Sequence, residues 1–397
     1  MKYAIVILDG ASGWPIEALG GKTTLQAADT PNLDALVKSG TMGLAFTVPS
    51  GAEPSSSAAC TSILGYDPVS DYVGRGAIEA ASMGITLAPD QVALRLNLVT
   101  VRDGIMASYS AGNIATEESA AIVTDIASDL DDATFKLYPG VAYRHILVVT
   151  GHPELLEATF TPPHDISDRR IESFMPKGPG TDFLLDYMGR ARVLLDNSGS
   201  NRCRTAGGSS PATDVWPFWP GAAPQQITPF AEMRGLSATM TSGVDLLNGL
   251  AVLVGMDRLS IPGVTGDSSN DYAAQTEGAL LSLDEHGLVV IHIESPDEEG
   301  HAGEVAGKVA AIEAIDREVI ARLRGYACEH QLRVLAMSDH PTPIEIKTHV
   351  GEPVPFVLAG PGIKHNRGRR FSESSAEETG LLLDPGHKVM DLLLGPS

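Results

Sequence analysis

The sequence has few cysteines and no long apolar run. Its three cysteines, Cys60, Cys203 and Cys328, are far apart and odd in number, which is not a disulfide framework and favours a reducing compartment. The first apolar run ends at Asp9, and no later run approaches the roughly 20 apolar residues that a membrane-spanning helix needs. We therefore expect a cytoplasmic protein with no membrane partner.

Basic residues are also scarce. The 28 Lys and Arg are outnumbered by 50 Asp and Glu, which gives a net charge of −22. This charge repels phosphate backbones, so we expect no nucleic-acid partner. An anionic substrate must meet a local cluster of Arg, Lys or metal. The sequence also lacks the pattern GxxxxGK[ST], so an ATP site would have to be unconventional. Oligomeric state stays open.

The chain begins and ends with the pattern of an α/β protein. Its 397 residues exceed the size of one typical core, which predicts two domains or a large domain with an insertion. A helix is expected over residues 30–40, with Thr30 as its N-cap. Apolar runs at 3–8, 249–255, 287–294, 332–339 and 354–360 alternate with helix-like stretches. These runs predict a doubly wound, mainly parallel sheet.

The middle of the chain has a different pattern. Residues 92–99 alternate in the period of two that is typical of a half-buried antiparallel strand, and residues 144–151 are suited to pair with them. We expect an inserted, smaller α+β domain at 78–172, between the two parts of the main domain at 1–77 and 173–397. The Gly-, Ser- and Pro-rich segment 197–224 holds Trp216 and Trp219, so it is expected to be ordered and to pack on the protein.

Carboxylates and imidazoles follow several of the predicted strands. Ligands gather at the carboxyl ends of the strands in such sheets. Carboxylate oxygen with imidazole nitrogen suits divalent ions such as Mn²⁺ and Zn²⁺. Six ligands are too many for one tetrahedral ion and suit two, which can clamp a transferring phosphoryl group. The candidate ligands are Asp9, Asp297, His301, Asp339, His340 and His349.

A nucleophile is available in "EPSSSAACTSILGYDP" at 53–68. Pro54 before a run of small residues predicts a helix start, where free backbone N–H groups favour a phosphate and a serine alkoxide. A bound metal would lower the pKa of such a serine.

Each motif alone has a structural explanation. An Asp after a strand is more often a turn residue, D-x-x-x-H more often a solvated helix face, and a serine run more often a helix cap. The adjacent Asp339 and His340 before "PTP" are harder to explain in this way. Taken together, the strand-end positions favour a metal site.

These residues carry a resemblance to a known family. The segments "LDG" at 8–10, "ILGYDP" at 63–68, "GRGAIEAA" at 74–81, "TPPHD" at 161–165, "SPDEEGHAGEVAGKVAAIEAID" at 295–316 and "SDHPTPIEIKTHVGEPVPFVL" at 338–358 resemble the archaeal-type, cofactor-independent phosphoglycerate mutases of the alkaline phosphatase superfamily. Within that family, "GNIATEES", "GVAYRHILVV" and "WPFWPG" are similar to a bacterial branch proposed as homoserine kinases.

The resemblance implies an alkaline-phosphatase-like fold and a two-metal centre. One divalent ion (Mn, Zn or Mg) would be held by Asp9, the nucleophilic serine, Asp339 and His340, and a second by Asp297, His301 and His349. The implied reaction interconverts 3-phosphoglycerate and 2-phosphoglycerate through a phosphoserine, without 2,3-bisphosphoglycerate.

The sequence departs from the family at the nucleophile. Relatives read Pro-Gly-Ser followed by an acid, whereas this chain has Pro54-Ser55-Ser56-Ser57. Counting from Pro54 and back from "ILGYDP" places Ser56 at the position of the nucleophile and Ser57 where the acid stands. Since Ser57 cannot move a proton at neutral pH, the rate and even the reaction depend on this difference.

Cationic anchors are needed for an anionic phosphoglycerate. The candidates for substrate binding are Arg75 between two glycines, Lys347, Arg144 and His164 in "TPPHD". For each, the alternative is a salt bridge or a structural turn.

Four functions remain in competition. The first is the mutase, and the second is a phosphotransferase acting on another small alcohol, such as a homoserine kinase. The third is a metal-dependent phosphatase, and the fourth is a relative that binds metal and ligand without turnover.

Overall fold

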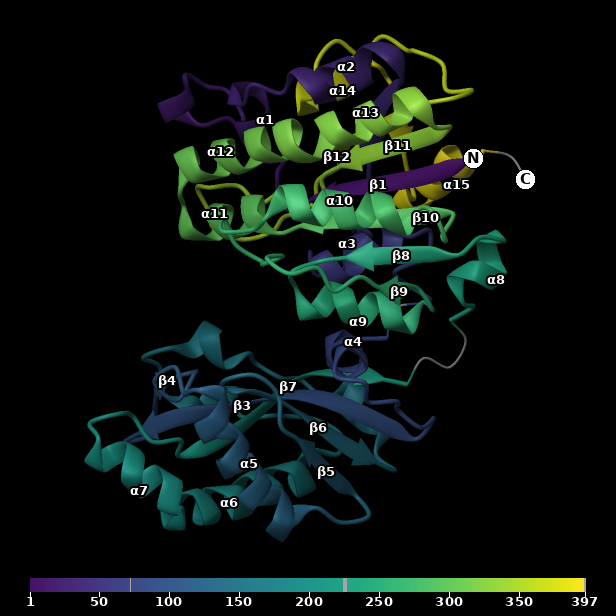
Figure 1. The fold of residues 1–397 in the computed structure, drawn as a ribbon. Helices are drawn as coiled ribbons and strands as arrows, with labels where there is room; N and C mark the ends of the chain where they lie inside the picture. Colours follow the sequence, from purple (N-terminus) through teal and green to yellow (C-terminus); the bar gives the residue numbers. More distant parts are fainter. Residues whose placement is uncertain (72, 224–226, 396–397) are drawn as a thin grey trace. The chain divides into compact units, whose positions relative to one another are not determined.

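The computed structural model describes residues 1–71, 73–223 and 227–395 and divides into two compact units. Unit 1 comprises residues 1–72 and 226–397, and unit 2 comprises residues 73–225 (Figure 1). Unit 2 is thus an insertion in the sequence of unit 1. Among the described residues, none of the helices has the length and apolar character needed to cross a bilayer.

Unit 1 is built on an eight-stranded sheet. β1 lies between β10 and β11 and is parallel to both, β8 continues the parallel set beyond β10, and β12 is antiparallel to β11 and β2. The doubly wound, mainly parallel sheet that we predicted is confirmed. The strands in spatial order are β13 (Leu382–Leu383), β2 (Thr41–Ala45), β12 (Val354–Ala359), β11 (Leu332–Met337), β1 (Lys2–Leu8), β10 (Leu288–Ile293), β8 (Ala238–Thr241) and β9 (Asp257–Arg258).

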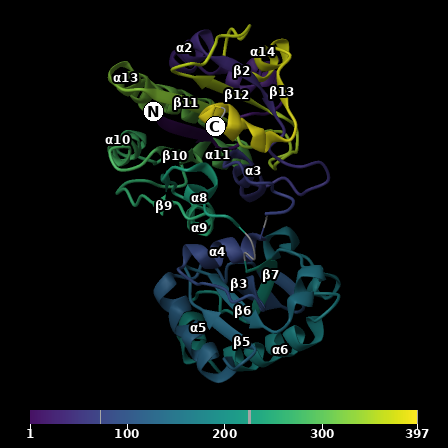
Figure 2. The same ribbon diagram turned by 90° about the vertical axis from the view of Figure 1, so that its right-hand side faces the viewer.

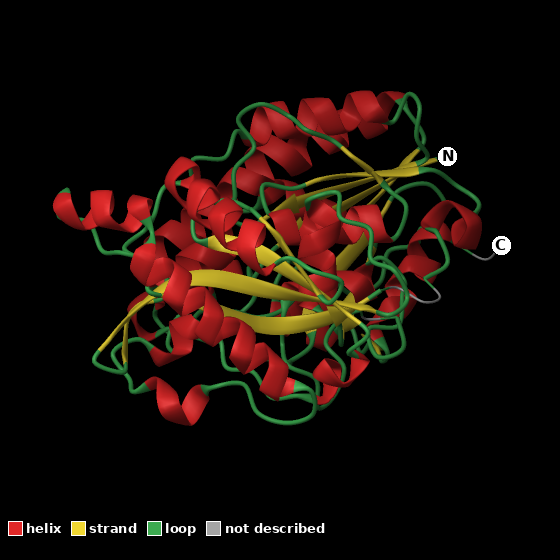
Figure 3. Cartoon of the chain, turned by 90° about the horizontal axis from the view of Figure 1, so that it is seen from below, coloured by secondary structure: helices red, strands yellow, loops and turns green. Residues whose placement is uncertain are grey.

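Helices cover both faces of this sheet, as the view coloured by secondary structure shows (Figure 3). One face packs a core from α2, α10, α12 and α13 against alternate residues of β1, such as Ala4, Val6 and Leu8. β1 is apolar on both faces because both are covered. The helices of unit 1 are α1 (Thr24–Ala27), α2 (Pro31–Ser39), α3 (Ser56–Ile63), α8 (Phe230–Arg234), α9 (Asp245–Leu253), α10 (Tyr272–Ser282), α11 (Ser295–Ala302), α12 (Val305–Ile315), a π-helical turn (Asp316–Ile320), α13 (Ala321–Glu329), α14 (Glu373–Glu378) and α15 (Val389–Leu394), with 3-10 turns at Glu17–Leu19 and Gly386–Lys388.

One local prediction in unit 1 was wrong. The run 249–255 was expected to be a strand, but most of it forms the end of α9, because a short buried apolar run does not distinguish a strand from a helix. Thr30 is the N-cap residue of α2 as predicted, although its side chain makes no capping bond among the described residues. The Asp316 carboxylate, from the π-helical turn, instead accepts the backbone N–H groups of Asn32 and Leu33.

Unit 2 contains an antiparallel sheet in the order β4-β3-β6-β5, with β7 paired to β3. The expected pairing of residues 92–99 with 144–151 is confirmed by β3 and β6. Figure 2 shows α4 on one side of this sheet and α5 and α6 on the other. The elements are α4 (Arg75–Ser82), β3 (Gln91–Arg102), β4 (Ile105–Ser108), α5 (Thr116–Leu130), β5 (Phe135–Tyr138), β6 (Arg144–Thr150), α6 (Thr181–Asn197), α7 (Gly199–Ala206) and β7 (Asp214–Ala222), with 3-10 turns at Pro153–Glu157, Pro163–Ile166 and Ile171–Phe174.

The expected insert boundaries, 78 and 172, differ from this division. Residues 173–223 pack within unit 2, because α6 completes its core and β7 extends its sheet. The tryptophan segment is ordered as expected over its described residues, since Trp216 is buried in that core. Two prolines in β7 hid the strand in the sequence. They are tolerated because β7 pairs only with β3 among the described strands and is therefore an edge strand.

Candidate active site

Polar side chains converge at one edge of the unit 1 sheet. β1, β10 and β11 are parallel neighbours, so their carboxyl ends lie at the same edge. Asp9 follows β1, α11 begins directly after β10, and Asp339 follows β11. The structure brings together all seven residues that were predicted to hold metal in this unit: Asp9, Ser56, Asp297, His301, Asp339, His340 and His349.

The first group forms around His340. Its Nε2 lies 3.1 Å from Ser56 Oγ, 3.2 Å from Asp339 Oδ2 and 3.6 Å from Asp9 Oδ1. Both of these carboxylate oxygens are buried and have no hydrogen-bond partner among the described residues. Buried polar atoms are rarely left unpaired, so this group of acceptors suits a cation.

The ring of His340 is oriented by Thr342. The Thr342 hydroxyl donates to Asp297 Oδ1, which leaves its oxygen to accept the His340 Nδ1–H over 3.3 Å. In a neutral ring the Nε2 lone pair then faces Ser56 and the two free carboxylate oxygens. An imidazole that donates its other N–H in this way is typical of a metal ligand.

The second group is formed by Asp297, His301 and His349. Asp297 and His301 lie one turn apart on α11, with His301 Nε2 3.0 Å from Asp297 Oδ2, and His349 Nε2 lies 3.5 Å from the same oxygen. Each ring places its Nδ1 against a backbone carbonyl, Lys347 O at 2.9 Å for His301 and Pro54 O at 3.3 Å for His349. Since a carbonyl only accepts, both Nδ1 atoms must donate.

The two Nε2 atoms of this group are only 2.9 Å apart. With both Nδ1 atoms protonated, two neutral rings would point lone pairs at each other and at a carboxylate. A cation between them removes that repulsion. When no metal is bound, a proton on His301 removes the same repulsion, because the hydrogen bond to Asp297 raises the pKa of His301 to about 9. The residues present therefore fit a metal ion.

Negative charge is concentrated here. Burial, and then the charges of Asp339 and Asp297, raise the pKa of Asp9 well above its usual range. Burial and the charge of Asp9 do the same to Glu294. Burial also raises the pKa of Asp297, but the bonds from His301 and His349 outweigh that effect and leave it well below its usual range. Divalent cations would offset this charge.

Gly10 allows the two ligand-bearing loops to meet. It has a positive φ of 58°, and a Cβ atom there would lie 2.3 Å from Asp297 Oδ1 and 2.6 Å from Thr342 Oγ1. Any other residue at this position would displace Asp297.

Several residues of the site were missed in the sequence. His292, within β10, has its Nε2 2.7 Å from Asp9 Oδ2 and its Nδ1 3.0 Å from the Ser242 hydroxyl, and Glu294 lies beside it. Lys308, fully buried on α12, donates to the backbone carbonyls of Thr342 and Ser12 and so ties the loops after β11 and β1 together. The sequence did carry one signal for His292, because it is a histidine inside an otherwise apolar strand, five positions before Asp297.

Ser56 is the first residue of α3. The N-cap is Ser55, whose hydroxyl accepts the Ala58 N–H and lies 3.1 Å from Ser57 Oγ. Ser56 and Ser57 are both buried. The Ser56 hydroxyl lies within hydrogen-bond distance of His340 Nε2.

The expected substrate contacts lie in both units. In unit 2, Arg75 stacks on Trp219 with its guanidinium carbon 3.8 Å from the ring centroid, the His164 ring lies 5.5 Å from the same ring, and Arg144 is exposed. In unit 1, Lys347 Nζ donates to Ala302 O at the end of α11. Lys347 therefore stabilises the second group, because its ammonium group binds the end of α11 and its backbone carbonyl orients His301.

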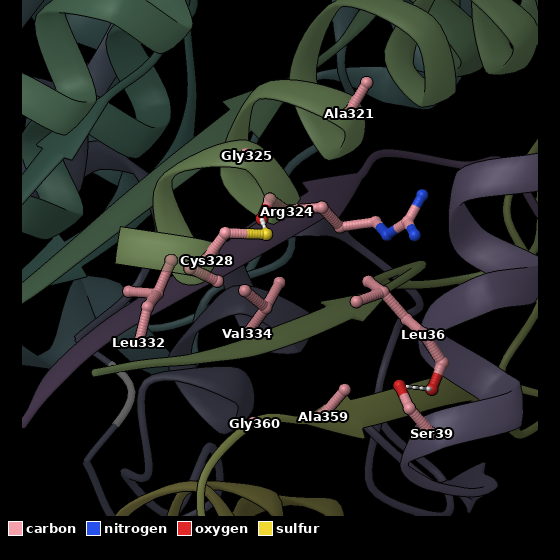
Figure 4. Close-up of a pocket in the computed structure, with 11 residues that line it drawn as sticks. Leu36, Ser39, Ala321, Arg324, Gly325, Cys328, Leu332, Val334, Ala359 and Gly360 are labelled. Atoms are coloured by element: carbon pink, nitrogen blue, oxygen red, sulfur yellow. Dashed lines mark hydrogen bonds between the residues drawn. The ribbon is translucent and has the colours of Figure 1, made fainter. Parts of the chain in front are cut away.

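A further cavity of unit 1 lies away from these residues. It has a volume of about 410 Å³ and lies between α2, α13 and the ends of β11 and β12 (Figure 4). Leu36, Leu332 and Val334 make it largely apolar, and it contains none of the predicted site residues. Its polar lining residues are Ser39, Arg324 and Cys328.

Comparison with known proteins identifies relatives along the whole chain. A family model described as 2,3-bisphosphoglycerate-independent phosphoglycerate mutase matches residues 37–201. The mutase of this name from Methanothrix thermoacetophila is 43% identical over 99% of this chain and all of its own, and one named as a probable mutase from Geobacter sulfurreducens is 39% identical over 99% and 100%.

Two solved structures have a similar fold. The PH0037 protein from Pyrococcus horikoshii gives a TM-score of 0.82, with 27% identity over 99% of this chain and 96% of its own. The cofactor-independent phosphoglycerate mutase from Thermoplasma acidophilum gives 0.68, with 27% identity over 99% of each chain. Because relatives of that name that are 43% and 39% identical match this chain over nearly its full length, the chain belongs to the 2,3-bisphosphoglycerate-independent phosphoglycerate mutase family.

Proposed function

We propose that this protein interconverts 3-phosphoglycerate and 2-phosphoglycerate by passing the phosphoryl group to Ser56 and back. The observation that carries the proposal is the position of the Ser56 hydroxyl, 3.1 Å from His340 Nε2. The same Nε2 faces the oxygens of Asp9 and Asp339 that find no hydrogen-bond partner within the described part of the chain. Family membership supports the substrate, because the relatives are named for this reaction.

The proposed site holds two divalent ions. Asp9, Ser56, Asp339 and His340 would hold one, and Asp297, His301 and His349 the other. Mn²⁺ and Zn²⁺ bind both the oxygen and the imidazole nitrogen ligands of these two sets, and Mg²⁺ binds their carboxylate oxygens. Bound ions would lower the pKa of the Ser56 hydroxyl and shield the charge of a phosphoryl group.

The chain's own residues prepare Ser56 for this role. Ser56 begins α3, where backbone N–H groups without helical partners favour an anion. The carbonyls of Pro54 and Lys347 orient two imidazoles, and Thr342 orients a third. The Ser56 hydroxyl, which is proposed to accept the phosphoryl group, is thus held next to imidazole groups of fixed orientation.

Unit 2 is proposed to bind the organic part of the substrate. The proposed contacts are Arg75, Arg144 and His164. Arg75 and Arg95 share the single carboxylate of Glu79, and the charge of Arg144 also acts on Arg95. Such an excess of guanidinium groups attracts carboxylate and phosphate and repels an ammonium group. This favours phosphoglycerate over homoserine, which carries an ammonium group. Lys347 is the weakest of the proposed contacts, because one of its donors is already used.

A coupled assay distinguishes the candidate functions. The purified protein is supplied with 3-phosphoglycerate and Mn²⁺, without 2,3-bisphosphoglycerate, and the formation of 2-phosphoglycerate is followed. Steady, Mn²⁺-dependent formation is expected. Free phosphate as the main product would indicate a phosphatase, phosphohomoserine formed from ATP and homoserine a kinase, and no product from any of these a relative without turnover. Each of these three results would contradict the proposal.

A further inference from the structure

The cavity between α2 and α13 lies apart from the proposed active site of unit 1. Its volume of about 410 Å³ is within the range of small-molecule sites. Leu332, which lines it, is the first residue of β11, whereas Asp339 follows the other end of that strand. The floor of the cavity is apolar and buried, and it consists of Leu36, Leu332, Val334 and Ala359.

The wall formed by α13 leaves the cavity open to solvent. Gly325 and Cys328 line the cavity, and both are exposed. A Cβ atom added at Gly325 would have no neighbour within 4 Å apart from its own helical turn. The cavity is thus a concave, mostly apolar recess with few polar groups that a small molecule can reach, which is the usual form of a ligand site.

Arg324 supplies a positive charge at one end of the cavity. Its Nη1 donates to Asn32 Oδ1 of α2 over 2.5 Å, and its side chain makes no other hydrogen bond within the described part of the chain. It also pairs with no carboxylate there, whereas Arg317 and Arg322 beside it both pair with Glu318. A guanidinium group that binds only a neutral amide has donors left for an anion.

The charged and apolar parts of the cavity lie in line (Figure 4). The Arg324 side chain extends toward α2, as its bond to Asn32 requires, and Cys328 and Leu332 lie at the opposite end. Val334 lies between the two ends. A ligand that matches this arrangement has an anionic head and an apolar body. A free phosphate ion does not match it, because an apolar floor cannot replace the water around a doubly charged ion.

We propose that this cavity binds a small carboxylate with an apolar body, such as a medium-chain fatty acid. The planar guanidinium group of Arg324 receives the carboxylate, and the apolar floor covers the chain. This proposal does not depend on the proposed function, because none of the lining residues belongs to the site at Ser56.

The test uses octanoate as the probe and the thiol of Cys328 as the reporter. The full-length protein carries Cys203→Ser, which leaves Cys328 as the exposed cysteine of the described chain. Alkylation of Cys328 by iodoacetamide, a neutral reagent, is followed by mass spectrometry at increasing octanoate concentration. We expect octanoate to slow the alkylation in a saturable way, because the bound chain covers the thiol.

Arg324→Gln tests the contribution of the charge. It should raise the half-saturating octanoate concentration by about 10- to 100-fold, the range for losing a hydrogen bond to a charged group. Arg322→Gln is the matched control, because Arg322 lies on the same helix but binds Glu318 and does not line the cavity. It should leave the half-saturating concentration unchanged.

Gly325→Leu fills the cavity and keeps both the charge and the thiol. The backbone has room for a side chain at this position, and leucine favours a helix more than glycine does, so the variant should unfold at no lower temperature than the wild-type protein. Ligand-observed NMR, which does not use the thiol, should show octanoate binding to the wild-type protein and none to Gly325→Leu.

Ligands of different charge separate this proposal from weaker kinds of binding. Octylamine, which has the same chain length and a positive charge, and inorganic phosphate should not slow the alkylation. An equal effect of octylamine would show that the apolar floor alone binds, and protection by phosphate would show a general anion site. Either result, an unchanged half-saturating concentration in Arg324→Gln, or no saturable effect of octanoate would overturn the proposal.

Discussion

Replacing Thr342 by valine tests the proposed metal centre without removing a ligand. Thr342 is fully buried, donates its hydroxyl hydrogen to Asp297 and accepts the Nδ1–H of His340. Its side chain therefore contacts one residue of each proposed site. Its backbone bonds to Ser12 and Lys308 do not involve the side chain and should persist in the variant.

The size of the effect follows from these two bonds. A hydrogen bond to a charged group contributes about 1.5 to 3 kcal/mol. Loss of a residue that orients a ligand costs roughly 10- to 100-fold in metal affinity. The two ranges agree, because about 1.4 kcal/mol corresponds to a factor of ten. We expect Thr342→Val to bind Mn²⁺ 10- to 100-fold more weakly.

The assay is calorimetric titration of the metal-free protein with Mn²⁺. Thr276→Val is the control, because Thr276 is also fully buried in unit 1 and donates its hydroxyl to Tyr272 O within α10. Both variants lose one buried hydroxyl, but only Thr342→Val should lose affinity. Equal Mn²⁺ affinity in Thr342→Val and the wild-type protein would refute the reasoning.

Further predictions concern the nucleophile, the metal content and the effect of pH. Ser56→Ala should abolish turnover in the coupled assay while Ser57→Ala keeps a measurable fraction, and full activity of Ser56→Ala would reject the assigned nucleophile. The wild-type protein should carry close to two divalent ions by elemental analysis, and His301→Ala and His340→Ala should each lose about one; no loss in either would reject the ligand sets. Burial, and then the charge of Arg95, lower the pKa of the fully buried His145 to about 3. Because the pKa of His145 is lower in the folded than in the unfolded protein, its contribution to stability is complete above about pH 6.5 and is lost as pH falls toward 3, with a loss of about 3 kcal/mol at about pH 4.5. Urea unfolding followed by tryptophan fluorescence should show that loss, and it should be smaller in His145→Asn; an equal loss in both proteins would contradict the assignment.

The sequence was informative where local pattern and chemistry agree. Asp9 and Asp339 directly follow apolar strands, and parallel pairing of those strands is enough to bring both carboxylates to one edge. Asp297 and His301 are one turn apart, so a helix after β10 places them on the same face. His349 belongs to no described helix or strand. The sequence offered it as a candidate ligand, but its place beside Asp297 and His301 was implied only by the family resemblance.

Other features depend on contacts between distant segments. His292 resembles a core residue of its strand until Asp9 is placed beside it. Lys308 has the spacing of an ordinary helical lysine, yet its ammonium group is buried between two loops. The insert was placed too short because the strand character of β7, with its two prolines, arises from pairing with β3. The run at 249–255 was misread because its burial suits a helix and a strand equally.

The central claim is that Ser56 carries the phosphoryl group during turnover. It is tested most directly by quenching the Mn²⁺-loaded protein with acid during turnover of 3-phosphoglycerate and mapping phosphorylated peptides by mass spectrometry. We predict phosphoserine at Ser56, formed fast enough to account for the rate of 2-phosphoglycerate production. Turnover with no phosphate on Ser56, or with phosphate on another residue, would contradict this account.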